Sequence, residues 1–250
     1  MFTANQLDSL KILVCDALRR NLHTENFSKS KKEDNSWVTN IDIQISQIVK
    51  QWAKEAIQEE YNFYSEEEHS TLSFPALVLD PIDGTKQLIL HYPECALSMA
   101  YLTSPSLTDS KNIGYIFNPF TQLEMKSWGE FYPMSKSNSK KERKKLCALI
   151  SDSEWEKGIT SRIESRFMWI KSGSIAHKLA LLSAGVGDFI ITYRPKSLWD
   201  IAAGSIIAAK RGIYPYTLDG SCLLSLDHEL FTSPLIWCDP ADLERILFQI

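Results

Sequence analysis

The stretch ALVLDPIDGTKQL, residues Ala76–Leu88, carries the features from which the fold and the chemistry can be worked out. Its apolar residues predict a short buried strand over Phe74–Leu79. Asp80 follows this strand, and Asp83 brings a second carboxylate three residues later, after a turn that Pro81 imposes. Two acids at the exit of a buried strand are costly unless a cation lies between them. The motif therefore predicts a cation site.

The oxygen atoms around this predicted site suit a hard divalent cation. The carboxylates of Asp80 and Asp83 can converge on one point, with the Ile82 carbonyl between them. Mg²⁺ prefers such oxygen ligands and often shares them with substrate phosphate oxygens. Gly84 and Thr85 follow where a helix should begin, and free backbone N–H groups there can receive an anion. A metal site beside an anion site indicates phosphate chemistry.

A different phosphatase motif has to be excluded. Phosphatases with an aspartyl nucleophile carry DxDGT after a strand, which is superficially similar to DPIDGT. Here the residue two before Asp83 is Pro81, and Asp80 stands one residue too early to be that nucleophile. The spacing therefore excludes this mechanism.

Three other acidic places could join the pair: Asp42 in WVTNID, Glu66 in the SEEE run and Asp200 in LWD. Each also has a purely structural explanation. An aspartate can cap a helix or be stabilised near a helix N-terminus. A run of glutamates can be a solvated turn. These acids form a site only if the fold brings them to the DPIDGT motif.

The composition excludes several classes of function. The chain has 250 residues, of which 44% are hydrophobic and 23% charged, as in an ordinary folded protein. Its net charge of -4 argues against a nucleic-acid polymer as partner. The five cysteines show no CxxC spacing and favour reduced thiols in a cytoplasmic protein. No apolar run approaches the length of a membrane span, which leaves only peripheral membrane association open.

Spacing and composition predict an α+β first half and an α/β second half. The first twenty residues have helical apolar spacing and no cleavable signal core. Further helices are predicted over 41–57, 153–165, 174–185 and a segment that Asp200 opens and Gly212 closes. Further strands are predicted over 95–102, 112–119, 122–129, 146–151 and 188–194. The polar stretch 28–36 is predicted to be a loop.

One polar, basic stretch divides the chain. Residues 135–145, SKSNSKKERKK, are predicted to be a surface linker. Residues 1–134 would then form an N-terminal α+β domain that carries most of the candidate metal ligands. Residues 146–250 would form a C-terminal α/β domain that carries Asp200 and the substrate-side residues.

Four motifs in order along the chain, VTNID, SEEE, DPIDGT and LWDIAAG, resemble those of a known family. This family is the inositol monophosphatase superfamily of Mg²⁺-dependent, lithium-sensitive phosphomonoesterases. The stretch GSIAHKLALLSAGVGDFI, which begins at Gly173 and Ser174, resembles the family's substrate-side helix and following strand. The resemblance covers most of the chain. It implies an α-β-α-β-α layered sandwich like that of fructose-1,6-bisphosphatase, and it leaves a homodimer open.

The resemblance also implies the metal ligands. By position in the motifs, Glu66, Asp80 and the Ile82 carbonyl would bind a first Mg²⁺. Asp80, Asp83 and Asp200 would bind a second Mg²⁺. A weaker third ion would lie near Asp42 and Glu66.

The catalytic roles follow from the same resemblance. Asp42 and Thr85 would position or activate the attacking water, and the neighbouring carboxylates of Glu66 and Asp83 would complete the proton relay. The metal ions would lower the pKa of that water and neutralise charge on the leaving oxygen. Neither a phosphoenzyme nor a histidine is required. Backbone N–H groups of Gly84 and Thr85 would hold the phosphate.

The substrate class rests on fewer residues. KEDNSWVTNID resembles the K-x-D-x-S-P-V-T-x-A-D loop of the 3'(2'),5'-bisphosphate nucleotidase branch, and Lys86 in DGTK fits the same branch. Inositol-specific members place a glutamate where Tyr193 stands, whereas Arg194 and Lys196 suit an additional phosphate. The resemblance therefore favours hydrolysis of 3'-phosphoadenosine 5'-phosphate to AMP and phosphate. The substrate-side residues would be Gly84, Thr85, Gly173, Ser174, Arg194, Lys196 and Asp200.

Several departures from that branch keep alternatives open. The branch often has SRSH where this chain reads SDSE, so that Asp152 and Glu154 replace basic groups. Leu88 stands where an aromatic residue is usual, and a glycine pair is reduced to Gly212. An inositol-1-monophosphatase or another sugar-phosphate phosphatase is the alternative, and a non-catalytic relative is a further one.

Overall fold

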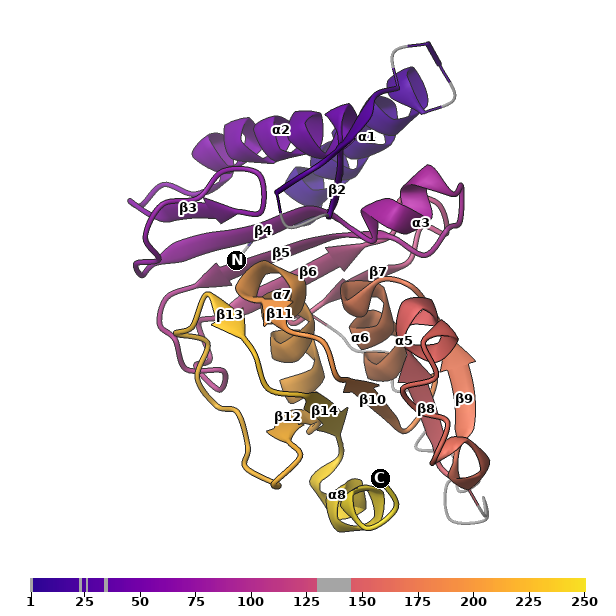
Figure 1. Cartoon of the computed structure of the whole chain (residues 1–250). Coiled ribbons are helices and arrows are strands. Elements are labelled where there is room, and N and C mark those ends of the chain that lie inside the picture. The colour runs from indigo at the N-terminus through magenta and orange to yellow at the C-terminus, as the bar shows by residue number, and fades with distance from the viewer. Residues whose placement is uncertain (1, 23, 26, 34–35, 130–144) are drawn as a thin grey trace.

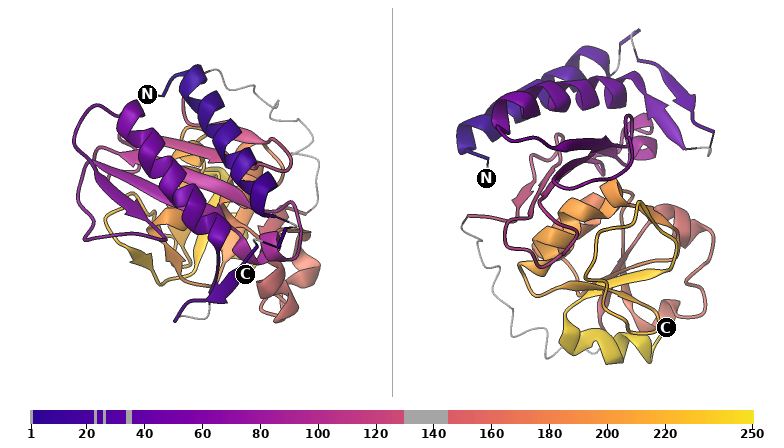
Figure 2. Two further views of the ribbon diagram at one scale, coloured as in Figure 1. Left: turned by 90° about the horizontal axis from the view of Figure 1, so that it is seen from above. Right: turned by 90° about the vertical axis from the view of Figure 1, so that its left-hand side faces the viewer.

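Two five-stranded sheets, separated by a pair of helices, form the centre of the molecule (Figure 1). This computed structural model describes residues 2–22, 24–25, 27–33, 36–129 and 145–250. Two further helices cover the outer face of the first sheet, and one helix covers the second (Figure 2). The expected α-β-α-β-α sandwich is therefore confirmed.

The helices and strands of the described residues have the following bounds. The helices are α1 (Ala4–Asn21), α2 (Asn40–Ala56), α3 (Thr85–Ile89), α5 (Asp152–Glu156), α6 (Ile175–Ser183), α7 (Leu198–Ala209) and α8 (Pro240–Leu247), with a 3-10 turn η1 (Glu164–Arg166). The strands are β1 (Lys29–Lys31), β2 (Trp37–Thr39), β3 (Asn62–Ser65), β4 (Ala76–Asp83), β5 (Ala96–Leu102), β6 (Ile113–Phe117), β7 (Glu124–Lys126), β8 (Cys147–Ile150), β9 (Met168–Lys171), β10 (Phe189–Thr192), β11 (Lys196–Ser197), β12 (Tyr214–Thr217), β13 (Leu230–Phe231) and β14 (Leu235–Cys238).

The first sheet has the strand order β3-β4-β5-β6-β7 and is antiparallel except for the parallel pair β3 and β4. Because side chains alternate along a strand, β4 serves two cores. Leu77 and Leu79 pack under α1 and α2. Ala76 and Val78 face α6 and α7 on the other side. Both faces of β4 are thus covered, and all but one of its eight residues are buried.

Helices α6 and α7 fill the space between the two sheets. Their apolar side chains join residues of β4, β5 and β6 on one side and of β8, β10 and β14 on the other in one core. The contact between α7 and β6 is close: a Cβ added at Gly114 would lie 2.3 Å from the Ala203 carbonyl oxygen. The middle layer is therefore fixed against the first sheet by backbone contact.

The second sheet has the strand order β12-β14-β10-β8-β9 and mixes parallel and antiparallel pairs. Its outer face packs on Ile246 of α8 and on Ile163 and Phe167. The helix predicted over 153–165 is wrong: only α5 and the short turn η1 are helical in this stretch. Gly158 ends the helical path because it adopts a left-handed backbone, with φ of 65°.

Other boundaries also differ from the predictions. The predicted loop 28–36 contains β1, which pairs with β2. Asp200 does not open its helix, because α7 begins at Leu198 and is capped by Ser197. The strands β3, β9, β12 and β14 and the helix α8 are structural elements that the sequence patterns did not indicate.

The predicted linker 135–145 lies, apart from Lys145, outside the described residues. The division into domains 1–134 and 146–250 stays a prediction, and one apolar core draws residues from both parts. None of the helices in the described ranges is long and apolar enough to cross a membrane.

Candidate metal centre and active site

A bulge in β4 brings the two carboxylates of DPIDGT to the same face of the sheet. Asp80 pairs with Ser98 and Asp83 pairs with Ala96, so three steps on β4 match two steps on β5. In a regular strand, residues three apart point to opposite faces, and one extra residue restores a common face. Pro81 lies inside this irregularity, where a missing N–H is tolerated. The strand thus runs through the motif instead of ending before it.

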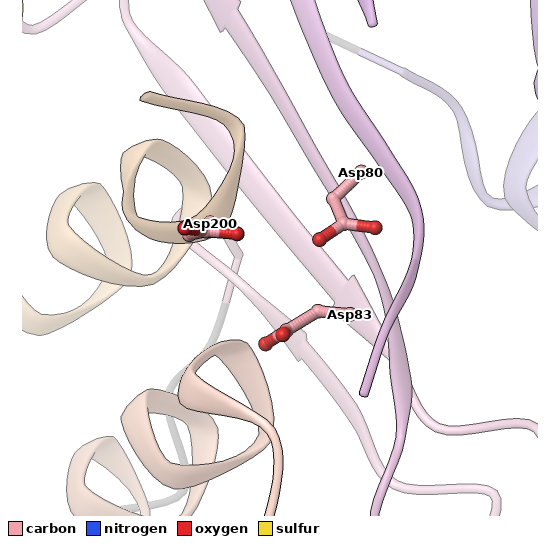
Figure 3. Close-up of side chains that lie close together, drawn as sticks. All are labelled: Asp80, Asp83 and Asp200. Atoms are coloured by element: carbon pink, nitrogen blue, oxygen red, sulfur yellow. The ribbon is translucent and has the colours of Figure 1, made fainter. Parts of the chain in front are cut away.

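Asp200 reaches the same point from helix α7 (Figure 3). It is the third helical residue, and its Oδ2 accepts a hydrogen bond from the backbone N–H of Ser197 at 2.8 Å. One carboxylate oxygen each from Asp80, Asp83 and Asp200 lies within 4.8 Å of the others. Three residues from two distant parts of the chain therefore form one acidic cluster.

Burial disfavours the charged form of each carboxylate in this cluster. Burial raises the pKa of Asp80 well above its usual value, and the charges of Glu66, Asp83 and Asp200 raise it further. Burial, followed by the charge of Asp83, raises the pKa of Asp200 to about 7. Buried carboxylates with raised pKa values are stabilised as anions by a bound cation. The donor set of oxygen atoms therefore fits a hard divalent ion such as Mg²⁺.

Asp83 is held by the start of helix α6. Its Oδ2 accepts hydrogen bonds from the Ser174 hydroxyl and the Ala176 N–H, both at 2.5 Å. Burial raises the pKa of Asp83, although these two hydrogen bonds act in the opposite direction. Ser174 is the N-cap of α6, as its sequence context predicts, and its hydroxyl also accepts from the His177 N–H at 2.9 Å.

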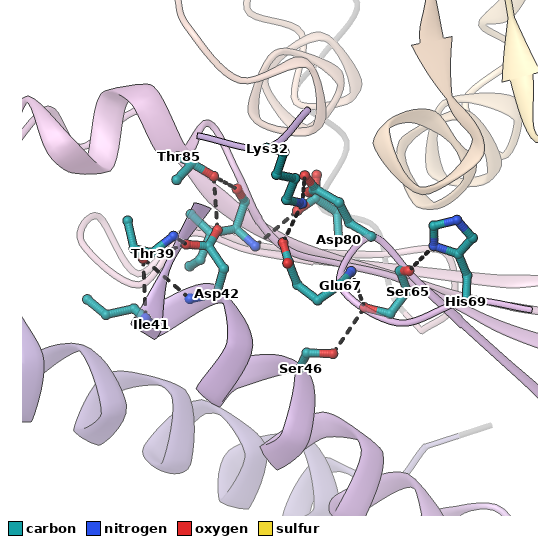
Figure 4. Close-up of polar contacts among 12 residues, drawn as sticks. Lys32, Thr39, Ile41, Asp42, Ser46, Ser65, Glu67, His69, Asp80 and Thr85 are labelled. Carbon is teal, nitrogen blue, oxygen red and sulfur yellow. Dashed lines mark hydrogen bonds and ion pairs between the residues drawn. The ribbon is translucent and has the colours of Figure 1, made fainter. Parts of the chain in front are cut away.

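Glu66 lies directly after β3 and beside the cluster, since its charge raises the pKa of Asp80. In this structure Lys32 Nζ lies 2.8 Å from Glu66 Oε1 and 2.8 Å from Glu67 Oε1. Figure 4 shows Lys32 reaching into the acidic region. Burial raises the pKa of Glu66 even though Lys32 opposes the shift. Glu68 points elsewhere and pairs with Lys50.

Asp42 and Thr85 form a second polar group beside the cluster (Figure 4). Asp42 Oδ2 accepts from the Thr39 N–H at 2.8 Å and from the Thr39 hydroxyl at 2.5 Å. Asp42 Oδ1 accepts from the Thr85 hydroxyl at 2.9 Å, and the Ile82 carbonyl is the alternative acceptor at 3.1 Å. Asp42 is thus both part of the cap of α2 and the partner of Thr85.

Two glycines permit close approach around these residues. Gly84 has φ of 95°, and a Cβ there would lie 2.9 Å from the Glu94 carbonyl oxygen. A Cβ added at Gly173 would lie 2.0 Å from the Gln87 side chain. The Gly173 N–H donates to Glu94 Oε2 at 2.9 Å. Both glycines therefore stand where a side chain would displace the site.

A cavity of about 150 Å³ opens beside the cluster and is lined in part by Asp83, Asp200, Lys178, Arg194 and Lys196. Lys178 is only 2% exposed, and its Nζ donates to the carbonyls of residues 172 and 173. Burial lowers the pKa of Lys178 to about 8. None of the three cations forms an ion pair with a described residue.

The sequence patterns did not single out several residues of this site. Lys32 was noted only as part of the stretch KEDNSWVTNID, and no local sequence pattern predicts that it contacts Glu66. Ser151 and Ser153 also line the cavity. Their place at and just after the end of the predicted strand 146–151 is a signal for a binding site, because ligands often bind at the carboxyl ends of such strands.

Comparisons with known proteins agree on one family. A model described as the inositol monophosphatase family matches residues 4–238. The 3'(2'),5'-bisphosphate nucleotidase CysQ of Salmonella typhimurium is 24% identical over 164 residues, which are 63% of this chain and 65% of that protein. Fructose-1,6-bisphosphatase/inositol-1-monophosphatase of Thermotoga maritima is 30% identical over 152 residues, or 54% of each chain. The chain thus matches about half to two thirds of the length of these relatives.

Solved structures show the same fold over a greater length. The IMPase of Thermotoga maritima has a TM-score of 0.78 and 22% identity and covers 98% of this chain and 96% of that chain. An IMPase/NADP phosphatase solved with Mg²⁺ and phosphate has a TM-score of 0.76 and 20% identity, with 98% and 94% of the two chains covered. Because the family model matches nearly the whole chain, this protein belongs to the inositol monophosphatase family.

Proposed function

We propose that this protein is a Mg²⁺-dependent phosphomonoesterase whose substrate is a 3'(2'),5'-bisphosphate nucleotide. In the favoured reaction, 3'-phosphoadenosine 5'-phosphate is hydrolysed to AMP and phosphate. The observation that carries the proposal is the convergence of Asp80, Asp83 and Asp200 within 4.8 Å. Such a buried acidic cluster is costly to the fold unless it binds cations.

The chain offers enough oxygen ligands for two ions. Asp80, Asp83 and Asp200 would hold one, and Glu66, Asp80 and the Ile82 carbonyl would hold another. A third, weaker ion near Asp42 and Glu66 belongs to the same proposal. When bound, these ions would lower the pKa of a water molecule and neutralise charge on the phosphate ester.

Thr85 is the residue best placed to orient the attacking water. Its hydroxyl hydrogen is directed at Asp42 Oδ1 or at the Ile82 carbonyl. The Thr85 oxygen can therefore only accept a hydrogen bond from a further group, and a water molecule would supply it. Asp42, which is itself held by Thr39, would take up the proton that passes through Thr85.

The cations of the cavity support a substrate with a second phosphate. Lys178 is a buried ammonium group that donates to two backbone carbonyls and forms no ion pair with a described residue, and a ligand anion would offset the cost of burying its charge. Arg194 and Lys196 line the same cavity. The scissile phosphate would be held by the backbone of Gly84 and Thr85.

A kinetic comparison of two substrates tests the proposal. We expect kcat/KM for 3'-phosphoadenosine 5'-phosphate to exceed that for inositol 1-phosphate by at least about tenfold, or about 1.4 kcal/mol, because charge-assisted hydrogen bonds to a second phosphate are strong. A much faster turnover of inositol 1-phosphate would favour the second candidate, an inositol or sugar-phosphate phosphatase. That candidate is favoured by the 30% identity to the Thermotoga maritima enzyme.

The proposal places the enzyme in the cytoplasm. All five cysteines lie in the described part of the chain, and none forms a disulfide. Reduced thiols are usual in that compartment. A homodimer also remains part of the proposal, and sedimentation of the purified protein would test it.

A further inference from the structure

Glu154 is a buried carboxylate in the cavity wall that the proposed reaction does not use. It lies in α5, is 1% exposed and lines the cavity. Its Oε1 accepts hydrogen bonds from the Tyr193 N–H at 2.6 Å, the Arg194 N–H at 3.3 Å and the Thr192 hydroxyl at 3.1 Å. Its Oε2 accepts from the Ser151 hydroxyl at 2.5 Å. One side chain therefore joins the segment after β8 to the segment after β10.

The groups that donate to Glu154 lie at the edge of the second sheet that faces the cavity. Strands β8 and β10 are parallel neighbours, so their carboxyl ends meet at one edge of the sheet, where ligands commonly bind. The chain leaving β10 carries Arg194 and Lys196 into the cavity wall. It then reaches Ser197, whose N–H donates to Asp200. Between β10 and α7 the two-residue strand β11 is the only regular secondary structure.

The charge of Glu154 is already satisfied by its own surroundings. Burial alone would raise its pKa, but hydrogen bonds from Ser151 and Tyr193 and the charge of Lys196 bring the pKa below its ordinary value. Four donors point at the carboxylate of Glu154, and neither Arg194 nor Lys196 forms an ion pair with it, although the charge of Lys196 acts on it. Neither cation forms an ion pair with a residue in the described ranges, and both line the cavity that a ligand would enter.

We infer that Glu154 is a positioning residue of the substrate-binding wall: it fixes the backbone of 192–194 so that Arg194 and Lys196 face a second phosphate group on the substrate. The inference rests on the proposed function, because it takes the ligand of this wall to be a phosphate ester. It also explains how an acid can stand in a wall that binds an anion, since the carboxylate is directed at backbone N–H groups.

The test compares three substitutions of Glu154 in the 250-residue protein loaded with Mg²⁺. Glu154→Ala removes the acceptor, Glu154→Asp shortens it by one methylene, and Glu154→Gln keeps an oxygen for the backbone donors. The matched control is Asp152→Ala, which removes an acid from the same short helix without removing a cavity-lining residue. KM and kcat are measured for 3'-phosphoadenosine 5'-phosphate, and the dissociation constant of AMP is measured by calorimetry.

We expect Glu154→Ala to raise KM and the AMP dissociation constant about tenfold, with kcat within about twofold of the wild type. Glu154→Gln should stay within about threefold of the wild type in both constants, because Oε1 remains as an acceptor. If Glu154→Ala does not fold, Glu154→Asp takes its place with an expected rise of about fivefold. Amide hydrogen exchange should be faster at Tyr193 and Arg194 in the same variants.

Two results would overturn the inference. One is an AMP dissociation constant that is the same in wild type and in the folded Glu154→Ala or Glu154→Asp variant. The other is a wild type that does not bind AMP. Failure of the proposed function is a separate result, because it appears as a wild type that releases no phosphate from any ester, whatever its affinity for AMP.

Discussion

The Ser174 hydroxyl donates to Asp83 Oδ2 at 2.5 Å, although the two residues lie 91 positions apart in the chain. Asp83 closes strand β4, and Ser174 caps helix α6. A carboxylate of the first half of the chain is therefore oriented by a helix of the second half. Groups that orient a metal-binding carboxylate in this way tune metal affinity.

Ser174→Ala should weaken Mg²⁺ binding as well as destabilise the protein. We expect loss of the cap to cost about 1 kcal/mol of unfolding free energy. We also expect the Mg²⁺ concentration for half-maximal activity to rise about tenfold, because Asp83 loses a hydrogen bond that orients it. Chemical denaturation and Mg²⁺-dependent phosphate release measure the two effects.

Thr3→Ala is the matched control for this prediction, since Thr3 caps α1 through the same kind of hydrogen bond and lies far from the site in sequence. It should cost a similar amount of stability and leave the Mg²⁺ requirement unchanged. An equal Mg²⁺ requirement in Ser174→Ala and the wild type would contradict the account.

The sequence indicated which acidic residues form the site, but it did not indicate how the backbone brings them together. The spacing of Asp80 and Asp83 pointed to one shared site, and the structure does bring them to Asp200. The reason differs from the expected one, because a bulge in β4 rather than a turn at Pro81 gives both side chains a common face. A bulge depends on how a strand pairs with its neighbour, and the DPIDGT motif does not reveal the register of its pairing with β5.

Contacts between segments that are distant in the sequence could not be predicted from local sequence patterns. The approach of Lys32 to Glu66 and the hold of Glu154 on residues 192–194 depend on how the layers stack. The helix prediction over 153–165 was wrong for a related reason. The stretch contains residues that favour a helix, but Gly158 adopts a left-handed backbone that ends the helix. Propensity is a weak guide where tertiary structure sets the backbone.

The stability of the metal-free protein should depend on pH through Asp200. Its pKa is raised to about 7 in the folded state, whereas an ordinary aspartate releases its proton near pH 4. The folded state therefore binds more protons between these values, and the contribution of Asp200 to stability falls as pH rises through them. We expect metal-free Asp200→Asn to melt several degrees higher, relative to wild type, at about pH 8 than at about pH 5.

Comparing the two proteins removes the effect of titratable groups that do not interact with Asp200. Burial lowers the pKa of His177 to about 4, which makes stability rise with pH, but His177 is the same in both proteins. Added Mg²⁺ should stabilise the wild type more at the higher pH, where the cluster is ionised. A melting difference that does not change with pH would show that Asp200 titrates normally.

Gly114→Ala should disrupt the contact between the first sheet and the middle helices. The added Cβ would lie 2.3 Å from the Ala203 carbonyl oxygen, so α7 has to move. We expect a loss of about 2–3 kcal/mol in urea denaturation, as for overpacked cores. Gly158→Ala is the control, because nothing lies within 4 Å of its added Cβ. Its expected cost is about 1 kcal/mol, from the left-handed backbone alone.

Thr85→Val should separate catalysis from binding. The substitution keeps the shape of the side chain and removes the hydroxyl that donates to Asp42. We expect kcat to fall about 100-fold, with KM within about threefold of the wild type, because the water loses its acceptor. Thr103→Val removes a hydroxyl that bonds Asp109 and Asn112 instead, and it should leave kcat unchanged. Equal kcat values in Thr85→Val and the wild type would remove Thr85 from the mechanism.

The most direct test of the metal centre is phosphate release from 3'-phosphoadenosine 5'-phosphate during a Mg²⁺ titration of the wild type and of Asp83→Asn. Asp83→Asn removes a charge from the cluster while keeping the size of the side chain. The account predicts that wild-type activity rises from zero to a plateau with Mg²⁺ and that Asp83→Asn loses at least about 100-fold at every concentration. Phosphate release that is indifferent to both Mg²⁺ and the substitution would contradict it.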